Sequence, residues 1–413
     1  RTSWNRRYAR NWGRLGMSCE YRQLGDVAIQ FIDGDRGKNY PSNNEFSNVG
    51  YCLFLNAKNV TPDGFSFGEV SFITQKKDAM LRKGKLEKND VVLTTRGTVG
   101  NVAFYGARVL YSNVRINSGM LIIRPDPSVF CPEYVYWLFR SDVIQDQIKR
   151  FRSGTAQPQL PISSIKKFEI PLVDIKTQKK IAAILSALDE KIAINREINE
   201  NLERQAASIF AGWLNTCTDF STIGDMAHNI LDYSPVASEQ IRLLNSSDVT
   251  EGVFPVVPLV PNKDLKGHFK KRFKFGDILY SEIRPRNHHY GFVLFDASDY
   301  IASTRLMVIR AIENKVSPAM LYQYLLLPEV EAEFTLKTES RSGTFPQGNY
   351  ADMASIQVPY SPTNSQTAVS EILSRIRFAI AQNQFESQRL AELRDALLPK
   401  LMSGEIDVSA VQL

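Results

Sequence analysis

The sequence predicts an α+β protein in which two mixed α/β domains alternate with two long helices. The helices are expected to form an antiparallel coiled coil, and an internal repeat would relate the two halves by a pseudo-twofold axis. Three observations predict this arrangement: duplicated sequence blocks, short β-type runs at the front of each copy, and a heptad pattern at the back. The 413 residues, 43% of them hydrophobic, are enough for two or three cores.

The duplication consists of seven blocks that recur in the same order, at offsets of about 186 to 199 residues. The clearest pairs are LGDVA at 24–28 with IGDMA at 223–227, NDVVLT at 89–94 with GDILYS at 276–281, MLIIRP at 120–125 with LMVIRA at 306–311, and RSGTAQP at 152–158 with RSGTFPQ at 341–347. One or two matches could be chance, but seven in order indicate a duplicated unit.

Changes of composition divide the chain into five segments. These are a basic tail at 1–16, a first mixed domain at 17–173, a central helix at 174–216, a second mixed domain at 217–360 and a C-terminal helix at 361–413. Runs such as VVLTT, MLIIR and LMVIR between turn residues predict strands in each mixed domain. A helix pattern follows a proline at 133–151 and again at 319–336.

The basic tail accounts for most of the net charge of +6, because residues 1–16 hold five arginines and no acid. The other 397 residues carry 45 basic and 44 acidic groups. We interpret the tail as disordered or artificially added; the alternative is a basic arm that lies on nucleic acid.

Both long helices have apolar residues that step by four and three positions over five heptads. This period is typical of a coiled-coil seam, and each helix of about 37 residues would span roughly 55 Å. The seam is assigned to Ile181, Leu185, Leu188, Ile192, Asn195 and Leu202 in the first helix and Leu373, Ile376, Ile380, Asn383, Leu390 and Leu397 in the second.

The seam turns polar near the middle of both helices, at Asn195, Asn199, Asn383 and Ser387. Antiparallel pairing lets these residues face one another, whereas a shifted register would bury amides against leucine. The alternative is that they are polar positions tolerated at a loosely closed centre.

The sequence carries no recognisable catalytic motif. Its four histidines have no metal-ligand spacing, its four cysteines form no CxxC pair, and it contains no GxSxG, P-loop or GxGxxG motif. The nearest nuclease-like pattern is Asp299 with Glu313 and Lys315, which an exposed turn explains more simply. We therefore expect a chain without catalytic residues, metal or cofactor of its own. With no run of 18 apolar residues it should not span a membrane, and the separated cysteines fit a reducing cytoplasm.

Grouped cations suggest a polyanionic partner. Residues 18–173 hold 20 basic and 15 acidic groups, and residues 215–360 hold 14 and 17. Each domain nevertheless has one basic cluster upstream of its VVLTT or DILYS strand, and such clusters can neutralise phosphates. The candidate contacts in these clusters are Lys76, Lys77, Lys270, Lys271 and Arg272. A solvated face is the alternative for either cluster alone.

Two polar loops in each domain have the residue types that contact base edges and phosphates. The first pair differs between the copies and is expected to read bases, with Arg96 and Thr98 answered by Arg284, Arg286, Asn287 and His288. The second pair is alike in both and suits phosphate contact, with Arg152, Ser153, Thr155 and Gln157 answered by Arg341, Ser342, Thr344 and Gln347. Ordinary turn chemistry is the alternative for the Ser-Gly-Thr loops.

The ordered blocks resemble the specificity subunit of type I restriction-modification systems, the HsdS family. The resemblance covers about residues 20–405 and rests on NDVVLTTRGTVGNVAFY and GDILYSEIRP and on the SGTAQPQLPISSIKKFEIPLV run that leads into the central helix. The second copy departs from the first in lacking its GTxG.

The resemblance implies that each mixed domain is a target-recognition domain for one half of a split site in double-stranded DNA. The coiled coil would set the gap. It also implies two methyltransferase subunits that hold S-adenosylmethionine and dock on the helices, and two restriction subunits that use ATP and Mg. A stand-alone metal-dependent nuclease and a coiled-coil adaptor that binds only proteins are the alternative functions.

Overall fold

The computed structural model describes residues 20–154, 157–263, 265, 267–340, 346–361 and 364–412. The chain forms two compact units. The first unit takes residues up to Glu190 and again from Leu390, and the second takes Lys191–Arg389. Both boundaries fall inside a long helix, so each long helix contributes one part to each unit.

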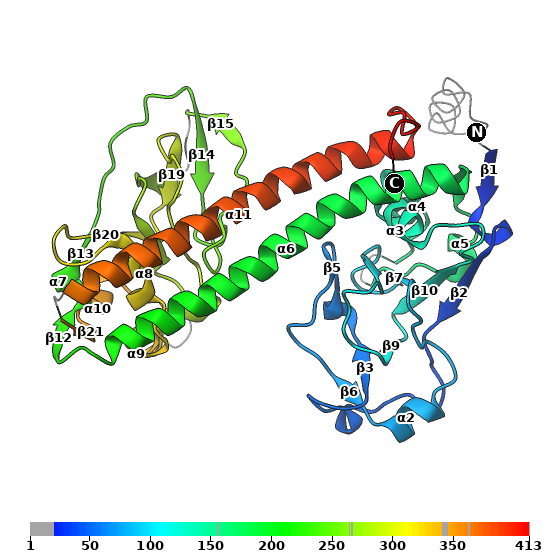
Figure 1. The fold of residues 1–413 in the computed structure, drawn as a ribbon, viewed down its shortest axis with the longest axis horizontal. Coiled ribbons are helices and arrows are strands. Elements are labelled where there is room, and N and C mark those ends of the chain that lie inside the picture. Colours follow the sequence, from blue (N-terminus) through cyan, green and yellow to red (C-terminus); the bar gives the residue numbers. More distant parts are fainter. Residues whose placement is uncertain are drawn as a thin grey trace. The chain divides into compact units, whose positions relative to one another are not determined.

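The first unit carries most of its strands in two small sheets (Figure 1). Its elements are β1 Glu20–Gln23, η1 Leu24–Asp26, β2 Ile29–Asp33, η2 Asn43–Glu45, β3 Cys52–Leu55, η3 Ala57–Asn59, β4 Val60–Thr61, β5 Gly64–Phe65, β6 Phe72–Ile73, α2 Gln75–Met80, β7 Val91–Thr94, β8 Val102–Phe104, β9 Val114–Ile116, β10 Met120–Pro125, α3 Pro132–Arg140, α4 Asp142–Phe151, α5 Ile162–Ile165, β11 Glu169–Leu172 and the start of α6 Ile175–Leu214. One sheet has the antiparallel order β2-β10-β7-β8, and the other has the order β6-β3-β9 with β3 and β9 parallel.

The second unit repeats this plan. Its elements are the rest of α6, β12 Asp219–Thr222, α7 Ile223–Met226, β13 Ala227–Asn229, β14 Gln240–Leu244, β15 Leu259–Pro261, β16 Phe269–Lys271, β17 Ile278–Ser281, η4 Pro285–Asn287, β18 Tyr290–Phe292, β19 Tyr300–Ser303, β20 Leu306–Ala311, α8 Pro318–Leu325, α9 Pro328–Glu339, α10 Tyr350–Ala354, β21 Gln357–Tyr360 and most of α11 Asn364–Met402. The order β13-β20-β17-β18 matches β2-β10-β7-β8, and parallel β14 and β19 match β3 and β9. The predicted α+β class and internal repeat are therefore confirmed.

The LGD and IGD blocks recur because each glycine lies against a later segment of its own unit. A Cβ on Gly25 would lie 3.1 Å from the Cβ of Lys166, and one on Gly224 would lie 3.1 Å from the Cβ of Ala354. Both close approaches stand beside the two-stranded pairs β1-β11 and β12-β21. Any larger side chain at these positions would push the paired segments apart.

The expected helix at 133–151 is in fact two helices. Ser141 has an extended backbone, and its N–H bonds back to the carbonyls of Trp137 and Leu138, so α3 ends there. The helix expected at 319–336 also divides, because Pro328 has no N–H to continue α8 and begins α9 instead. In the first unit, α3 packs its buried face on the β2-β10-β7-β8 sheet, where Tyr134 and Trp137 are fully buried.

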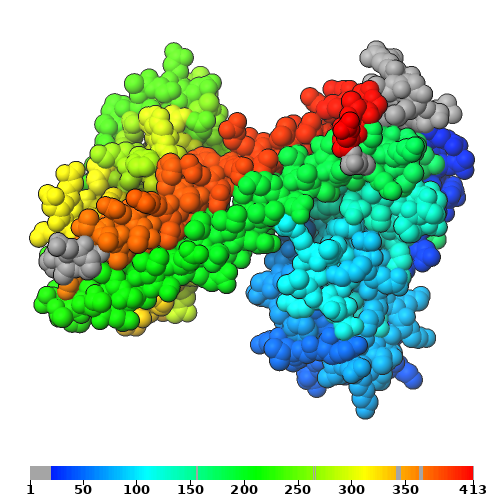
Figure 2. Space-filling view, viewed as in Figure 1, coloured from blue at the N-terminus to red at the C-terminus, as the bar shows by residue number. Residues whose placement is uncertain are grey.

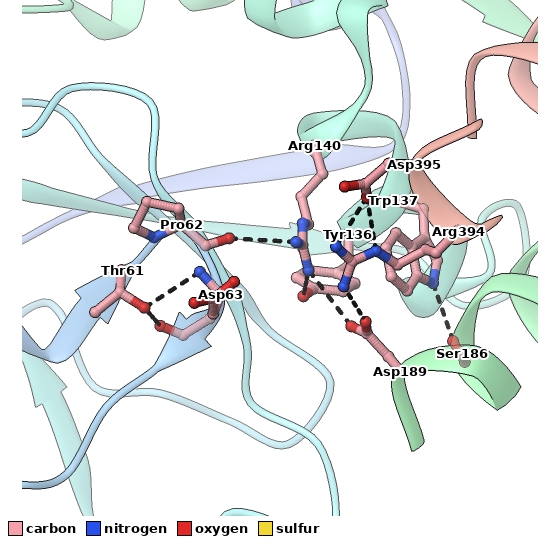
Figure 3. A network of polar contacts seen from close by, with 11 residues as sticks. Thr61, Pro62, Asp63, Tyr136, Trp137, Arg140, Ser186, Asp189, Arg394 and Asp395 are labelled. Carbon is pink, nitrogen blue, oxygen red and sulfur yellow. Dashed lines mark hydrogen bonds and ion pairs between the residues drawn. The ribbon is translucent and has the colours of Figure 1, made fainter. Parts of the chain in front are cut away.

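The long helices run antiparallel within each unit, as predicted. In the second unit, Asn195 contacts Ser387 and Asn199 contacts Asn383, so rising numbers on α6 meet falling numbers on α11. In that unit the two helices lie side by side along their length (Figure 2). In the first unit the carboxylate of Asp189 accepts a hydrogen bond from Arg394 (Figure 3).

The seam assigned from the heptads is the covered side of both helices. Its buried members are Ile181, Leu185, Asn195, Leu373, Ile376 and Ile380, and its half-buried members are Leu188, Ile192, Leu202, Asn383, Leu390 and Leu397.

The four polar seam positions make specific hydrogen bonds within the second unit. The amide of Asn383 donates to Asn199 Oδ1 at 2.8 Å, and the Asn199 amide donates to the Ile380 carbonyl at 3.3 Å. Asn195 Nδ2 donates to Glu386 at 2.8 Å and to Ser387 Oγ at 3.2 Å. These residues therefore face one another, as the antiparallel arrangement predicts, and do not line an open centre. Among the described residues, no helix is both long and apolar enough to cross a lipid bilayer.

Candidate nucleic-acid interface

The first unit brings its two predicted contact loops together. The loop after β7 and the segment after α4 form a small extension of the sheet, in which the Leu160 N–H donates to the Thr95 carbonyl at 2.9 Å and Arg96 bridges Gln159. Ser153 and Gln159 exchange two backbone hydrogen bonds of 2.9 and 2.8 Å. Residues from two sequence regions about 60 positions apart are thus held on one backbone framework.

The second unit builds the same framework at the corresponding positions. The Gly348 N–H donates to the Glu282 carbonyl at 2.8 Å, the Arg284 N–H donates to the Pro346 carbonyl at 3.2 Å, and Ile283 bridges Gln347. Backbone pairing therefore fixes where the first predicted contact loop of each unit starts. We call these segments, residues 95–101 after β7 and 282–289 after β17, the first and second recognition loops. This juxtaposition is required if one patch is to contact DNA, and sequence reasoning could not establish it.

Most of the candidate side chains on these loops reach solvent. The exposed ones are Arg96, Thr98, Arg152, Ser153, Gln157, Arg284, Arg286 and Asn287. His288 and Gln347 are half-buried. Thr155, Arg341, Ser342 and Thr344 lie outside the described residues, as does the basic tail.

The first recognition loop is shaped by glycines and by its own hydroxyl contacts. Gly97 and Gly100 have φ of 72° and 107°, a region that glycine adopts without strain. The Thr94 hydroxyl donates to the Thr98 carbonyl and accepts from the Asn101 N–H at 2.9 Å. The α4 residue Gln145 donates its amide to the Gly100 carbonyl at 3.0 Å, which ties the loop to the helix behind it.

The second recognition loop is held by ion pairs. Arg284 and His288 have φ of 47° and 54°, which non-glycine residues rarely adopt. The His288 ring lies 3.1 Å from Glu251 and 2.8 Å from Glu331 of α9. The hydrogen bond with Glu251, assisted by that with Glu331, raises the pKa of His288 above its ordinary value. Arg286 lies 3.1 Å from Glu339, also on α9.

The basic clusters divide into exposed and covered members. Lys76 and Lys270 are exposed, as phosphate contact requires. Lys77 is largely covered and pairs with Glu45 at 2.9 Å, and the Arg272 guanidinium donates to the Pro235 and Ser298 carbonyls at 3.3 and 3.0 Å. Both have protein partners already and are weaker candidates.

Lys271 requires a correction. Its side chain is 4% exposed, and Nζ donates to the Leu306 carbonyl at 2.7 Å and lies 3.5 Å from Glu282. Burial lowers the pKa of Lys271. Because it alternates with exposed Lys270 along β16, it points to the inner face of the strand and cannot contact a phosphate there.

Sequence reasoning missed the residues that position the loops. Gln145, Glu251 and Glu331 lie on neither loop, and nothing in a single sequence connects them to it. Arg305 was also missed: it is exposed, and its carbonyl accepts from the Glu282 N–H at 2.9 Å. Its place directly before the repeated LMVIRA block was the available signal, because that strand runs beside the recognition loop.

The nuclease alternative finds no support in the geometry. Asp299 is paired with Arg242. Lys315 lies in a turn after β20, where its carbonyl accepts from Tyr360 and Gln366. Over the described residues, no three or more His, Cys, Asp or Glu side chains gather in a way that could hold a metal ion.

The family follows from a match that covers most of the chain. The type I restriction modification DNA specificity domain matches residues 18–204 and again 249–394. The chain belongs to this family and carries two copies of the domain.

Individual relatives agree with this assignment. The HindI specificity subunit of Haemophilus influenzae is 35% identical over 179 residues, which are 43% of this chain and 39% of that protein. The MjaIX specificity subunit of Methanocaldococcus jannaschii is 24% identical over 379 residues, 84% of this chain and 86% of that protein. The crystal structure of an S subunit from M. genitalium has the same fold, with a TM-score of 0.58, 16% identity and coverage of 93% and 96%. The predicted membership of the specificity-subunit family, which is non-catalytic, is confirmed.

Proposed function

We propose that each unit of this chain reads one half of a split DNA site, and that the chain delivers this specificity to a type I restriction-modification assembly. One observation carries the proposal. The two units build the same loop framework from corresponding strands, yet the exposed residues differ, with Arg96 and Thr98 in the first and Arg284, Arg286 and Asn287 in the second. Two domains that recognise different bases are expected to share a backbone framework and to differ in the exposed side chains on it.

The residue types on the loops suit this role. Arginine can donate two hydrogen bonds to the edge of guanine, and asparagine can pair with adenine. Arg152 and Ser153 stand on the adjoining segment of the first unit and are suited to hold the phosphate backbone beside the base that Arg96 reads. Exposed Lys76 and Lys270 would add contacts without base preference.

The antiparallel helices are suited to set the gap between the half-sites. Both α6 and α11 run without interruption through the boundary between the units, and the amide contacts of Asn195, Asn199 and Asn383 disfavour a slip in register. We propose that the number of unread base pairs depends on this register.

The proposed assembly supplies the chemistry that this chain lacks. It would contain two methyltransferase subunits, docked on the helices, which use S-adenosylmethionine to methylate adenine. Two restriction subunits would use ATP and Mg to cleave DNA. We propose that the chain works in the cytoplasm, and the unpaired thiols of Cys52, Cys131 and Cys217 suit a reducing compartment.

The direct test is to express the chain with its methyltransferase partner and to map methylated adenines in the DNA of the host. A split motif with a fixed gap is expected. Arg96→Ala should lower the discrimination between bases in one half-site by about 1 to 3 kcal/mol. Arg284→Gly should lower it by a similar amount in the other half-site, and glycine can adopt the positive φ of that position.

The matched control is Arg22→Ala, which removes an exposed arginine of β1 that pairs with Glu20, and it should leave both halves unchanged. A contiguous motif, or an effect of both loop variants on the same half, would contradict the proposal. Cleavage of DNA by this chain alone, abolished by Glu313→Ala, would instead favour the nuclease.

A further inference from the structure

Gly100 and His288 occupy the same position in the two recognition loops. Each loop is closed by a backbone hydrogen bond from the end of its first strand, from Thr94 N–H to the Asn101 carbonyl at 2.9 Å and from Ser281 N–H to the His289 carbonyl at 2.8 Å. Gly100 and His288 directly precede those closing residues, and both have a positive φ. The second unit thus places a titratable side chain where the first has none.

The helix behind each loop contacts this position with the corresponding residue. In the first unit the Gln145 amide of α4 donates to the Gly100 carbonyl. In the second unit Glu331, 186 residues later and near the start of α9, lies 2.8 Å from His288 Nε2. The neutral anchor of the first loop is therefore replaced by a carboxylate and an imidazole.

Both ring nitrogens of His288 face carboxylates. Nε2 meets Glu331 and Nδ1 meets Glu251, whose own N–H donates to the His288 carbonyl at 2.8 Å. Ionised carboxylates only accept hydrogen bonds, so both nitrogens can donate only when the ring is an imidazolium. Neutral imidazole would turn one lone pair toward a carboxylate.

The other titratable or charged groups near His288 have contacts of their own. Tyr290 stands beside it, with ring centroids 6.1 Å apart, and Arg286 is engaged with Glu339. His289 Nδ1 contacts the Val249 carbonyl at 2.9 Å and the Thr250 hydroxyl at 3.1 Å.

Resting on the proposed function, we propose that His288 is a protonation-dependent positioning residue for the second recognition loop, so that only the second half-site is read in a pH-dependent way. The protonated ring fixes the left-handed backbone conformation of residue 288, which is uncommon for any non-glycine residue, and orders Arg284, Arg286 and Asn287. Since the two carboxylates raise the pKa of His288, the ordered loop is fully stabilised below the ordinary value near 6.5. This stabilisation is lost as pH rises through the raised pKa. Gly100 and Gln145 do not titrate in this range.

The first measurement needs no DNA. Hydrogen exchange of the full chain, corrected for the intrinsic pH dependence of exchange, is followed between pH 5.5 and 8.5 for residues 284–290 and 96–102. Protection of the second loop should fall with rising pH by up to about tenfold per pH unit, the limit for one linked proton. Protection of the first loop should stay constant.

His288→Asn is the key variant, because asparagine tolerates a positive φ but does not titrate. It should abolish the pH dependence of the second loop. His268→Gln, which alters an exposed histidine elsewhere in the second unit, should preserve it. The same pH series is then repeated as competition binding by the methyltransferase complex, with duplexes altered in one half-site at a time.

Discrimination at the second half-site should weaken as pH rises, and discrimination at the first should not. Equal pH profiles of the two loops, or an unchanged profile in His288→Asn, would overturn the role of His288 even if both half-sites are read. Loss of base preference in both halves at every pH would overturn the proposed function. If base preference is absent but protection of the second loop still depends on pH and loses that dependence in His288→Asn, the proposed function is rejected and the role of His288 is retained.

Discussion

Arg124 of β10 makes a bidentate ion pair with Asp90, whose carboxylate lies buried just before β7. Arg124 Nε and Nη2 each lie 2.8 Å from a different carboxylate oxygen, and the Asp90 side chain is 1% exposed. The second unit repeats the pair between Arg310 and Asp277, with distances of 2.6 and 2.8 Å. Each aspartate also accepts a backbone N–H from the preceding turn, so the pair fixes the strand that leads to the recognition loop.

Removing either aspartate should destabilise its own unit. Asp90→Ala leaves the partly buried Arg124 guanidinium without its main partner. We expect the free energy of unfolding of the first unit to fall by about 2 to 3 kcal/mol, less than for a fully buried pair. Hydrogen exchange should show lower protection in the first unit for Asp90→Ala and in the second unit for Asp277→Ala. Glu87→Gln is the matched control, because Glu87 pairs with the same Arg124 but is 69% exposed. It should cost less than about 0.5 kcal/mol. Uniform loss of protection across both units would contradict this assignment.

Asp189 should be more important to the first unit than its neighbour Asp395, although both pair with Arg394. The Asp189 carboxylate contacts both Arg394 and Arg140 (Figure 3). Both arginine side chains are largely buried, whereas the Asp395 side chain is 65% exposed. Asp189→Ala removes a carboxylate shared by two covered guanidiniums, and Arg394 then keeps only exposed Asp395 and Arg140 only the Tyr136 hydroxyl and the Pro62 carbonyl. We expect this to lower the free energy of unfolding by about 2 to 3 kcal/mol, and Asp395→Ala to lower it by less than about 0.5 kcal/mol. Urea unfolding followed by hydrogen exchange in the first unit measures the difference. Equal effects of the two variants on the free energy of unfolding would contradict the larger contribution expected of Asp189.

The repeat and the helical pairing could be predicted because they depend on periodic signals. Heptads specify which side of α6 and α11 is covered, and the polar positions Asn199 and Asn383 lie at matching heights only if the helices are antiparallel. The blocks recur because the same strands, glycine contacts and Asp-Arg pairs are built twice.

The positioning of the recognition loops could not be predicted, because it depends on contacts between residues distant in sequence. Glu331 reaches His288 across 43 positions, and Thr95 meets Leu160 across 65. Lys271 was assigned to a basic cluster because the sequence does not show which face of a short strand a lysine occupies. The helix expected at 133–151 was misjudged because apolar residues continue on both sides of the break at Ser141. In the helix expected at 319–336 the available signal was Pro328, which has no N–H to continue a helix.

The two seam asparagines should respond oppositely to replacement by leucine. Asn195 is fully buried, and its Oδ1 has no hydrogen-bond partner among the described residues. Asn195→Leu removes this unsatisfied atom together with the amide that donates to Glu386 and Ser387. Those two partners keep other contacts, because exposed Glu386 pairs with Lys191 and Ser387 Oγ donates to the Asn383 carbonyl, so we expect the second unit to be stabilised by about 1 kcal/mol. Asn199→Leu should destabilise it by about 1 to 2 kcal/mol, because the Asn383 amide loses its acceptor. Protection of residues 191–214 and 366–389 against hydrogen exchange reports both changes. The same sign for both variants would refute this distinction between the two amides.

Lys270 and Lys271 provide a matched pair for testing phosphate contact, since they are adjacent on β16 but differ in burial. If exposed Lys270 contacts a phosphate, Lys270→Met should weaken DNA binding by the assembled complex for all sequences alike and lower the slope of log affinity against log salt by about 1. Lys271→Met should leave that slope unchanged, because the buried amine is bonded to the Leu306 carbonyl and lies near Glu282. Affinity is measured between 50 and 200 mM salt, a range in which counterion release dominates, and the fold of each variant is checked by hydrogen exchange. A reduced slope for Lys271→Met with the fold intact would contradict this assignment. It would mean that Lys271 leaves the inner face of β16 when DNA binds, because from that face it cannot reach a phosphate.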